Sequence, residues 1–354
     1  MNADATDLND AAAARLAPAR PGCGPMASAE GPLRRRVLDA VRAAGAAARI
    51  DLAKELGVSP ASVGTIAAEL IEAGFVQEVE PRRSEPRRDG DGPRGRPRVE
   101  LGLRPEAGFV AGLKLSDHAH TAVVMDFAGG VVSEAALPRP RFRLRSQALL
   151  DEAEAALDRA LAAAGMPRAA LSAVGVGLPG LVRHESGRVL WSPILTDRDV
   201  AFGPTLRARL GLPVGLDNDA NLLALSELWF GAARAEPDFA IVTIERGLGM
   251  GLVLGGRLWR GAMGLGMEIG HVTVQLDGAL CRCGKRGCLE AYVADYALVR
   301  EASTALDRDW GGGEPPGTEA LLAALAEEAR AGAPAARAIY ERAGRYLAVG
   351  LANV

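Results

Sequence analysis

The sequence contains little cysteine, carries almost no net charge and has no long hydrophobic run. Only 4 of the 354 residues are cysteine, which argues against a disulfide framework and fits a reducing cytoplasm. The formal net charge is −3, so any contact with DNA must come from a local surface. No apolar stretch is long enough to span a bilayer, and the N-terminus has no signal-peptide pattern. We therefore expect a cytoplasmic protein without membrane attachment.

Three of the four cysteines lie within eight residues, at Cys281, Cys283 and Cys288, and His271 lies ten positions before the first of them. One imidazole and three thiolates complete a tetrahedral shell that Zn²⁺ favours. Four protein ligands leave no open coordination position, so such an ion would hold a loop in place and would not catalyse. Three reduced cysteines without metal are the alternative. Glycines at the positions of a tight turn favour the zinc site.

Other polar residues lie near this cysteine cluster or ahead of a predicted helix. Asn218 and Asp219 follow a predicted strand, Glu268 precedes His271 by three residues, and Glu290 directly follows the cluster. Carboxylates, an amide and an imidazole suit the donors and acceptors of sugar hydroxyls. Each residue alone would be read as an ordinary surface residue. Their grouping near a metal site favours a carbohydrate pocket.

The N-terminal quarter divides into a tail and a helical segment. Residues 1–30 are rich in alanine, proline and glycine, and we predict a flexible tail. Beyond it, the pattern predicts helices over 34–45, 50–57 and 61–75, followed by a strand over 75–79. Two short helices joined by a tight turn are typical of a helix-turn-helix, whose second helix enters a DNA major groove. An ordinary helical hairpin is the alternative.

The second of these short helices has clear boundary signals. Ser59 is a predicted N-cap, Pro60 stands at the first helical position, and Gly74 ends the helix. Its exposed N-terminal residues are small, so few direct base contacts are available. The residues that we predict to contact DNA from this helix are Ser59, Ala61, Ser62 and Thr65.

A basic segment over 81–98 follows the predicted strand. It holds seven arginines against three acidic residues, a local charge of +4. This composition fits the wing of a winged helix, so we assign 31–98 to a DNA-binding domain. Arg94 and Arg96 are the predicted wing contacts, and the arginine of Gly95-Arg96-Pro97 could enter a minor groove. A solvated linker is the alternative.

From residue 99 onward the chain has an α/β pattern. Hydrophobic runs and turn residues predict strands over 108–115, 121–129, 171–180 and 211–219, helices over 146–164 and 221–232, and a glycine-rich hairpin over 239–261.

Together these features resemble the ROK family (repressors, open reading frames and sugar kinases). The matching motifs are LGVSPASVGTIAAELIEAGFV, Gly95-Arg96-Pro97, Gly177-x-Pro179-Gly180, Asn218-Asp219-Ala220-Asn221, Glu268-Ile-Gly-His271 and CRCGKRGCLE. The resemblance implies an α/β protein in which a winged helix-turn-helix precedes an actin-like (ribonuclease H-like) two-lobed sugar-kinase fold with sugar in the cleft. The first lobe would be 99–216 and the second 217–354. By match, the sugar-binding residues would be Asn218, Asp219, Glu268, His271 and Glu290, with His271 also a zinc ligand beside Cys281, Cys283 and Cys288.

Two loops depart from the pattern of the family's kinases. The first reads KLSDH from Lys114 onward, where those kinases carry Asp-x-Gly-Gly-Thr. Lys114 replaces a metal-organising aspartate, while Ser116 and Asp117 replace glycines that let the backbone approach phosphate. The second loop reads ERGLG from Glu245 onward in place of Gly-Thr-Gly-x-Gly. The Glu245 carboxylate would repel polyphosphate by on the order of a few kcal/mol. We therefore do not expect ATP binding.

Two further departures concern the sugar and the C-terminus. Ile194 stands where relatives often carry a sugar-contacting asparagine, so an atypical ligand is expected. The chain stops at Val354, inside a predicted helix, whereas the family continues through another strand and helix. We therefore expect a C-terminally incomplete second lobe.

These observations lead to a functional hypothesis with two alternatives. We expect a sugar-responsive transcriptional regulator, a repressor, that binds operator DNA as a homodimer or higher oligomer and takes a monosaccharide or sugar-phosphate effector. It would carry structural Zn²⁺ and no catalytic residue. One alternative is an ATP-dependent sugar kinase with a DNA-binding head, in which Asp219 would be the catalytic base. The other is a truncated remnant without activity.

Overall fold

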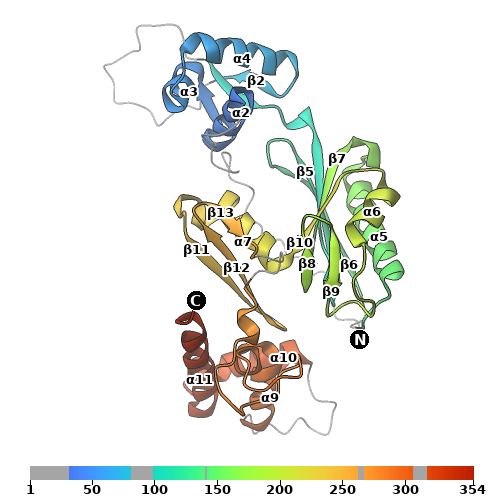
Figure 1. The fold of residues 1–354 in the computed structure, drawn as a ribbon, viewed down its shortest axis with the longest axis vertical. Helices are drawn as coiled ribbons and strands as arrows, with labels where there is room; N and C mark the ends of the chain where they lie inside the picture. Colours follow the sequence, from blue (N-terminus) through green and yellow to red (C-terminus); the bar gives the residue numbers. More distant parts are fainter. Residues whose placement is uncertain (1–31, 81–98, 140–141, 262–266, 306–316) are drawn as a thin grey trace. The chain divides into compact units, whose positions relative to one another are not determined.

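The computed structural model describes residues 32–80, 99–139, 142–261, 267–305 and 317–354 (Figure 1). The predicted tail over 1–30 and the predicted wing over 81–98, with Arg94 and Arg96, lie outside the described residues. The chain divides into two compact units, one of residues 1–219 and 225–236, the other of residues 220–224 and 237–354. None of the helices in the described ranges is long and apolar enough to cross a membrane.

The helices of the N-terminal region form where the sequence predicts them: α2 (Leu33–Ala44), α3 (Arg49–Leu56) and α4 (Pro60–Glu72). Ser59 caps α4, because its Oγ accepts the Ser62 N–H at 3.0 Å. Gly57 adopts a left-handed conformation (φ +66°) that turns the chain between α3 and α4. The apolar face of α4 is buried in a shared core at Val63, Ala67 and Leu70.

A small antiparallel sheet of order β1-β3-β2 completes this region, with β1 (Ala46–Ala48), β2 (Val76–Val79) and β3 (Glu100–Leu103). β2 and β3, which flank residues 81–98 in the sequence, pair with each other. β3 begins beyond the boundary at residue 98 that the sequence suggests. It pairs with β1 and β2, and Leu101 and Leu103 lie in the same core as the helices α2–α4.

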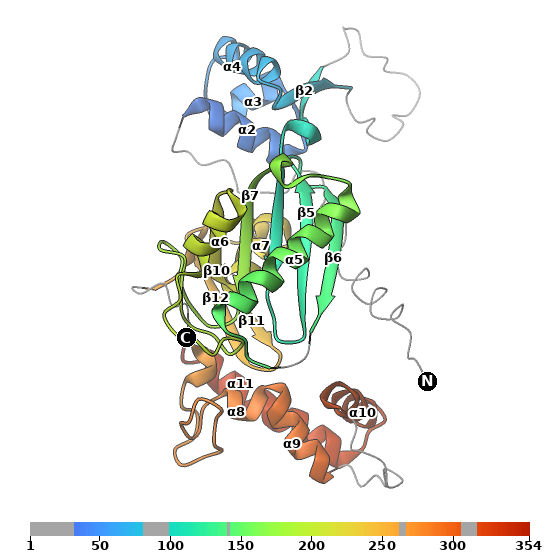
Figure 2. The ribbon, with the colours of Figure 1, turned by 90° about the vertical axis from the view of Figure 1, so that its right-hand side faces the viewer.

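The rest of the first unit is a mixed sheet of order β10-β7-β4-β5-β6. β4, β5 and β6 are antiparallel neighbours, while β7 lies parallel to β4 and β10 parallel to β7. Helix α5 covers one face of this sheet (Figure 2). This arrangement confirms the α/β, ribonuclease H-like fold class. The strands are β4 (Phe109–Lys114), β5 (Ala119–Asp126), β6 (Val131–Pro138), β7 (Leu171–Leu178) and β10 (Val214–Asn218), with a β8 (Leu181–Arg183) and β9 (Arg188–Trp191) hairpin; the helices are α5 (Ser146–Ala164) and α6 (Phe202–Leu210).

The second unit combines a three-stranded antiparallel sheet of order β11-β12-β13 with a group of helices. The hairpin predicted over 239–261 is present and gains β13 as a third strand. The sequence places the start of this lobe at residue 217, which falls inside β10 of the first sheet. The elements are α7 (Asp219–Phe230), which the division into units splits, β11 (Phe239–Ile244), β12 (Leu248–Leu254), β13 (Arg257–Trp259), α8 (Glu290–Val293), α9 (Asp295–Ala305), α10 (Thr318–Arg330) and α11 (Pro334–Leu351).

Candidate metal knuckle and sugar site

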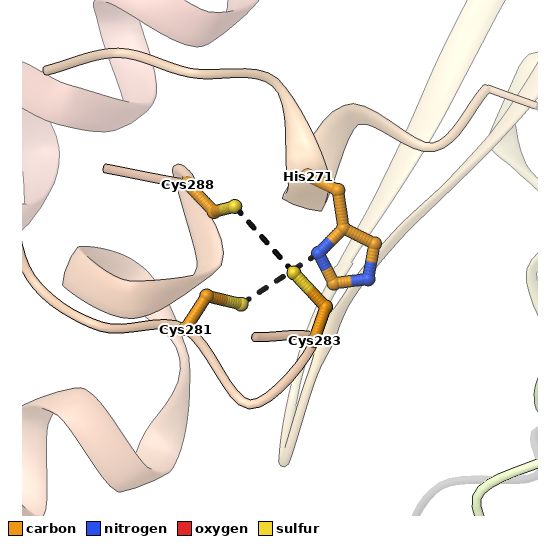
Figure 3. Close-up of side chains that lie close together, drawn as sticks. All are labelled: His271, Cys281, Cys283 and Cys288. Atoms are coloured by element: carbon orange, nitrogen blue, oxygen red, sulfur yellow. Dashed lines mark hydrogen bonds between the residues drawn. The ribbon is translucent and has the colours of Figure 1, made fainter. Parts of the chain in front are cut away.

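The structure brings the four predicted metal ligands together. His271 lies on the short 3-10 helix η4 (Ile269–His271), and the three cysteines lie on the following loop, which we call the knuckle (residues 272–289). One ligand atom from each of the four residues lies within 4.8 Å of the others. His271 Nδ1 is 3.7 Å from Cys281 Sγ, and Cys283 Sγ is 3.7 Å from Cys288 Sγ (Figure 3). The described residues therefore contain a His/Cys₃ group that could hold a metal ion.

Two glycines shape the knuckle. The Cys281 N–H donates to the Lys285 carbonyl at 2.8 Å, and Gly284 turns the chain between them with φ +92°. Gly287 has φ +73°, and a Cβ atom there would lie 1.6 Å from the Gln275 carbonyl oxygen. Only glycine fits that position without a shift of the backbone. The spacing Cys-x-Cys-Gly-x-x-Gly-Cys thus has a steric cause.

The three thiols differ in the direction of their pKa shifts. Burial, with the neighbouring thiols, raises the pKa of Cys288 to about 12, and burial also raises the pKa of Cys281. At Cys283 burial acts in the same direction, but hydrogen bonds from the Lys285 N–H and the other thiols outweigh it and lower the pKa. A bound divalent cation displaces thiol protons and favours the thiolates. The donor set therefore fits Zn²⁺.

Glu290 connects the knuckle to the second departing loop. Its carboxylate is buried and accepts hydrogen bonds from the Leu248 N–H and the Tyr296 hydroxyl, each at 3.3 Å. The Cys281 thiol donates to the same carboxylate at 3.5 Å, so Cys281 lies between His271 and Glu290. Tyr296 had no signal in the sequence. Burial, chiefly, raises its pKa, so the phenol remains a hydrogen-bond donor.

The other predicted sugar residues lie in two regions of the chain. Glu268 is exposed, and its carbonyl accepts the His271 N–H at 3.0 Å, so the two residues share one helical turn. Asn218 ends β10, and its Nδ2 donates to the Gly180 carbonyl at 3.0 Å. Asp219 begins α7. Asn218 and Asp219 belong to the first compact unit, whereas Glu268, His271 and Glu290 belong to the second.

The β4–β5 loop, which departs from the kinase pattern, is hydrogen-bonded to a buried side chain of its own lobe. The Ser116 N–H donates to His120 Nδ1 at 3.2 Å, and His120 is fully buried. His120 Nε2 lies 2.8 Å from Glu152 Oε2, and Arg139 contacts the same carboxylate at 3.2 Å. Burial is the main cause that lowers the pKa of His120, which favours the neutral ring. Sequence reasoning did not identify this network.

The β11–β12 loop is organised differently. The Glu245 N–H donates to the Gly247 carbonyl at 3.0 Å, which forms a tight turn. A Cβ atom on Gly247 would lie 3.1 Å from Glu290, so the loop passes close to that carboxylate.

The predicted DNA-contacting residues that the structure describes lie at the start of α4. Ala61 and Thr65 are exposed, Ser62 is half-buried, and Ser59 is the cap. The Thr65 hydroxyl donates to the Ala61 carbonyl at 3.2 Å.

The arginines of α2 differ in their surroundings. Arg34 and Arg35 are exposed. Arg36 donates to the Leu56 carbonyl at 3.0 Å and is half-buried. Its guanidinium is thus bonded to the last residue of α3.

Comparison with known proteins identifies one family and several relatives of this chain. The ROK family model matches residues 110–354. The xylose repressor of Caldicellulosiruptor bescii is 30% identical over 252 residues, which are 71% of this chain and 61% of that repressor. The glucokinase of Streptomyces coelicolor is 31% identical over 70% of this chain and 78% of its own length. A crystal structure of a ROK family transcriptional regulator, a homolog of the E. coli Mlc protein, covers 86% of this chain and 75% of its own, with 29% identity and a TM-score of 0.68.

Proposed function

Because the chain belongs to the ROK family, we propose that it is a sugar-responsive DNA-binding transcriptional repressor. The observation that carries this proposal is the helical segment α2–α4 with the sheet β1-β3-β2, joined in one chain to the ROK domain. A sugar kinase needs no such module. Two similarities support the proposal. One is to a xylose repressor, and the other is to the structure of a ROK family transcriptional regulator that covers 86% of this chain.

DNA binding would rely on α4 in a major groove and on basic residues at its flanks. Two such units in a homodimer would contact successive operator half-sites. Exposed Arg34 and Arg35 on α2, with Arg94 and Arg96 of the wing segment, would supply contacts to the phosphate backbone. Such contacts make the affinity fall as salt rises. A protein that binds operator DNA would act in the cytoplasm.

The effector site would include the knuckle, and its other residues are proposed from their match to the family. Zn²⁺ bound by His271 and the three cysteines would fix the imidazole, and the imidazole would contact a sugar hydroxyl. The remaining sugar contacts would be Asn218, Asp219, Glu268 and Glu290. Sugar binding would favour one arrangement of the chain and so change operator affinity, and linkage makes this coupling reciprocal.

Sugar kinase activity is the second candidate. The Streptomyces coelicolor glucokinase is 31% identical to this chain, and the xylose repressor is 30% identical. Asp219 would then act as the base on a sugar hydroxyl. Two observations weigh against it. The Ser116 N–H, which a phosphate-binding loop would offer to the nucleotide, is bonded to His120. Lys114 is exposed at the end of β4, where those kinases carry an aspartate.

Two assays on the full chain separate these functions. Fluorescence anisotropy with labelled promoter DNA should show sequence-preferring binding that weakens as salt rises. A thermal-shift screen should identify the sugar, because a ligand at a hundredfold excess over its Kd adds about 2.7 kcal/mol. That sugar should remain unphosphorylated with MgATP. Binding to all DNA sequences alike, or phosphorylation at rates of ordinary kinases, would contradict the proposal.

A further inference from the structure

The three cysteines of the knuckle differ in their access to solvent. Cys281 and Cys288 are buried, whereas Cys283 is exposed. The difference follows from the local fold, because Cys283 lies in a turn in which the Gly284 N–H donates to the Cys281 carbonyl at 3.0 Å. Residues 282–286 of this turn are all exposed. Of the three thiols, Cys283 is therefore the one that a small solute reaches first.

Cys283 also has a second sulfur at short range. Its Sγ lies 3.7 Å from Cys288 Sγ (Figure 3). A disulfide bond needs the two sulfurs at about 2.05 Å, so an approach of about 1.7 Å would close it. Cys288 is held in place, because it forms a β-bridge with Thr273 and lies in a small buried cluster with Ala291. The exposed turn that carries Cys283 is the part that can move.

We propose that Cys283 is an oxidation site of the knuckle, and that a hydroperoxide joins it to Cys288 in a disulfide and so removes two metal ligands. This inference goes beyond the proposed function and rests on the proposed metal site. A bound cation keeps its cysteine ligands in the thiolate form. The thiolate is the nucleophile of cysteine chemistry, so a metal ligand that solvent reaches is open to attack on a peroxide.

The oxidation has two steps. The Cys283 thiolate attacks the terminal oxygen of the hydroperoxide, the O–O bond breaks, the other oxygen leaves as hydroxide or alkoxide, and Cys283 becomes a sulfenic acid. The Cys288 thiolate then attacks the Cys283 sulfur, the S–O bond breaks and hydroxide leaves. The two sulfurs together lose two electrons, and the hydroperoxide gains them. His271 and Cys281 would remain as two of the four ligands, which are too few for a structural zinc site.

Tryptic mapping of the zinc-loaded full chain after treatment with hydrogen peroxide tests this directly. Cleavage after Arg282, Lys285 and Arg286 places the three knuckle cysteines on three different peptides. We expect the Cys283 and Cys288 peptides to be joined by a disulfide. Zinc should appear in a chromogenic chelator at the same rate as the linked peptides form. Dithiothreitol followed by zinc should restore the metal content.

Alkylation and two variants give independent readouts. In a short pulse of N-ethylmaleimide without peroxide, Cys283 should react on the order of tenfold faster than Cys281 or Cys288. Cys283→His keeps a nitrogen ligand and removes the reactive sulfur, so it should retain zinc in peroxide. Cys23→Ser removes the one cysteine outside the knuckle. It is the matched control and should release zinc as the wild type does.

The outcomes separate the oxidation site from the metal site on which it rests. Wild-type protein that takes up no zinc on loading would contradict the metal site. Zinc that stays bound, with the knuckle thiols intact, at a peroxide concentration that oxidises the metal-free chain would overturn the oxidation site alone. A disulfide that includes Cys281, or zinc release from Cys283→His at the wild-type rate, would do the same. If Cys283→His does not load zinc, the wild-type peptide map decides by itself.

Discussion

The two loops that depart from the kinase pattern are held in different ways. In the β4–β5 loop, the Ser116 N–H is bonded to buried His120, and the ring of His120 is bonded to Glu152. Where the β11–β12 loop ends, the N–H of Leu248, the first residue of β12, is bonded to Glu290, which also contacts the knuckle. The first loop is thus locked by its own lobe, whereas the second depends on the knuckle.

The comparison shows that two loops that depart from the kinase pattern can be held by different kinds of partner. The β4–β5 loop is hydrogen-bonded to side chains of its own lobe. A loop bonded to Glu290 instead stays connected to the knuckle through that carboxylate. Each perturbation below should act on one loop and leave the other unchanged.

Loss of the metal should give the largest effect, and it should reach the second loop only. Cys288→Ser removes a buried ligand, and structural zinc sites contribute on the order of 10 kcal/mol of apparent binding energy. We expect a variant without zinc in which hydrogen exchange at Leu248 accelerates while Ser116 stays protected. Metal analysis and exchange mass spectrometry provide the readouts. One zinc per chain in the variant, or equal loosening of both loops, would refute the distinction.

The glycines of the knuckle offer a matched pair of substitutions. Gly287→Ala places a Cβ 1.6 Å from the Gln275 carbonyl, so the backbone must move at a cost of about 3–4 kcal/mol. Gly284→Ala meets nothing within 4 Å and carries only the strain of its positive φ, about 1–2 kcal/mol. Chemical unfolding and zinc retention check both variants. A Gly287→Ala variant that is as stable as Gly284→Ala would show that the steric argument is wrong.

A substitution in the first lobe should affect the first loop alone. Glu152→Ala leaves the Arg139 guanidinium buried without its carboxylate, which costs about 3 kcal/mol. Glu134→Ala, at an exposed position of β6, is the control and should change stability little. Exchange at Ser116 should rise in the first variant, and zinc content should stay at the wild-type value. Loss of zinc would mean that the loops are not independent.

The smallest expected effect is a pH dependence of the first lobe. Since the pKa of His120 is lowered from 6.5, its neutral form stabilises the fold above that pH, and this stability is lost as pH falls through the lowered value. The loss is at most about 1.4 kcal/mol per pH unit. His120→Asn keeps an acceptor for the Ser116 N–H and removes the titration. Denaturant unfolding between pH 7.5 and 5 should be flatter in this variant, and an identical slope would rule out His120 as the cause.

The sequence alone predicted the features whose signals are local. The Cys/His spacing identified the four residues that could hold a metal ion, Ser59-Pro60 marked the start of α4, and residues 146–164 matched the full length of α5. These depend on turns, caps and helical periodicity within a few neighbouring residues.

Features that depend on pairing between distant residues were not predicted. β1 is three alanines with no strand propensity of their own, and it forms because β3 pairs with it. His120 and Glu152 are 32 residues apart, so only the packing of α5 on the sheet makes them partners. Tyr296 meets Glu290 because α8 turns directly into α9.

The central claim is that sugar binding and operator binding are coupled in this chain. The most direct test is the Kd for labelled promoter DNA, measured at fixed salt with and without a saturating amount of the sugar that raises the melting temperature. We predict a change of at least about fivefold, the lower range of allosteric coupling. An unchanged Kd, together with MgATP-dependent phosphorylation of that sugar, would contradict the account.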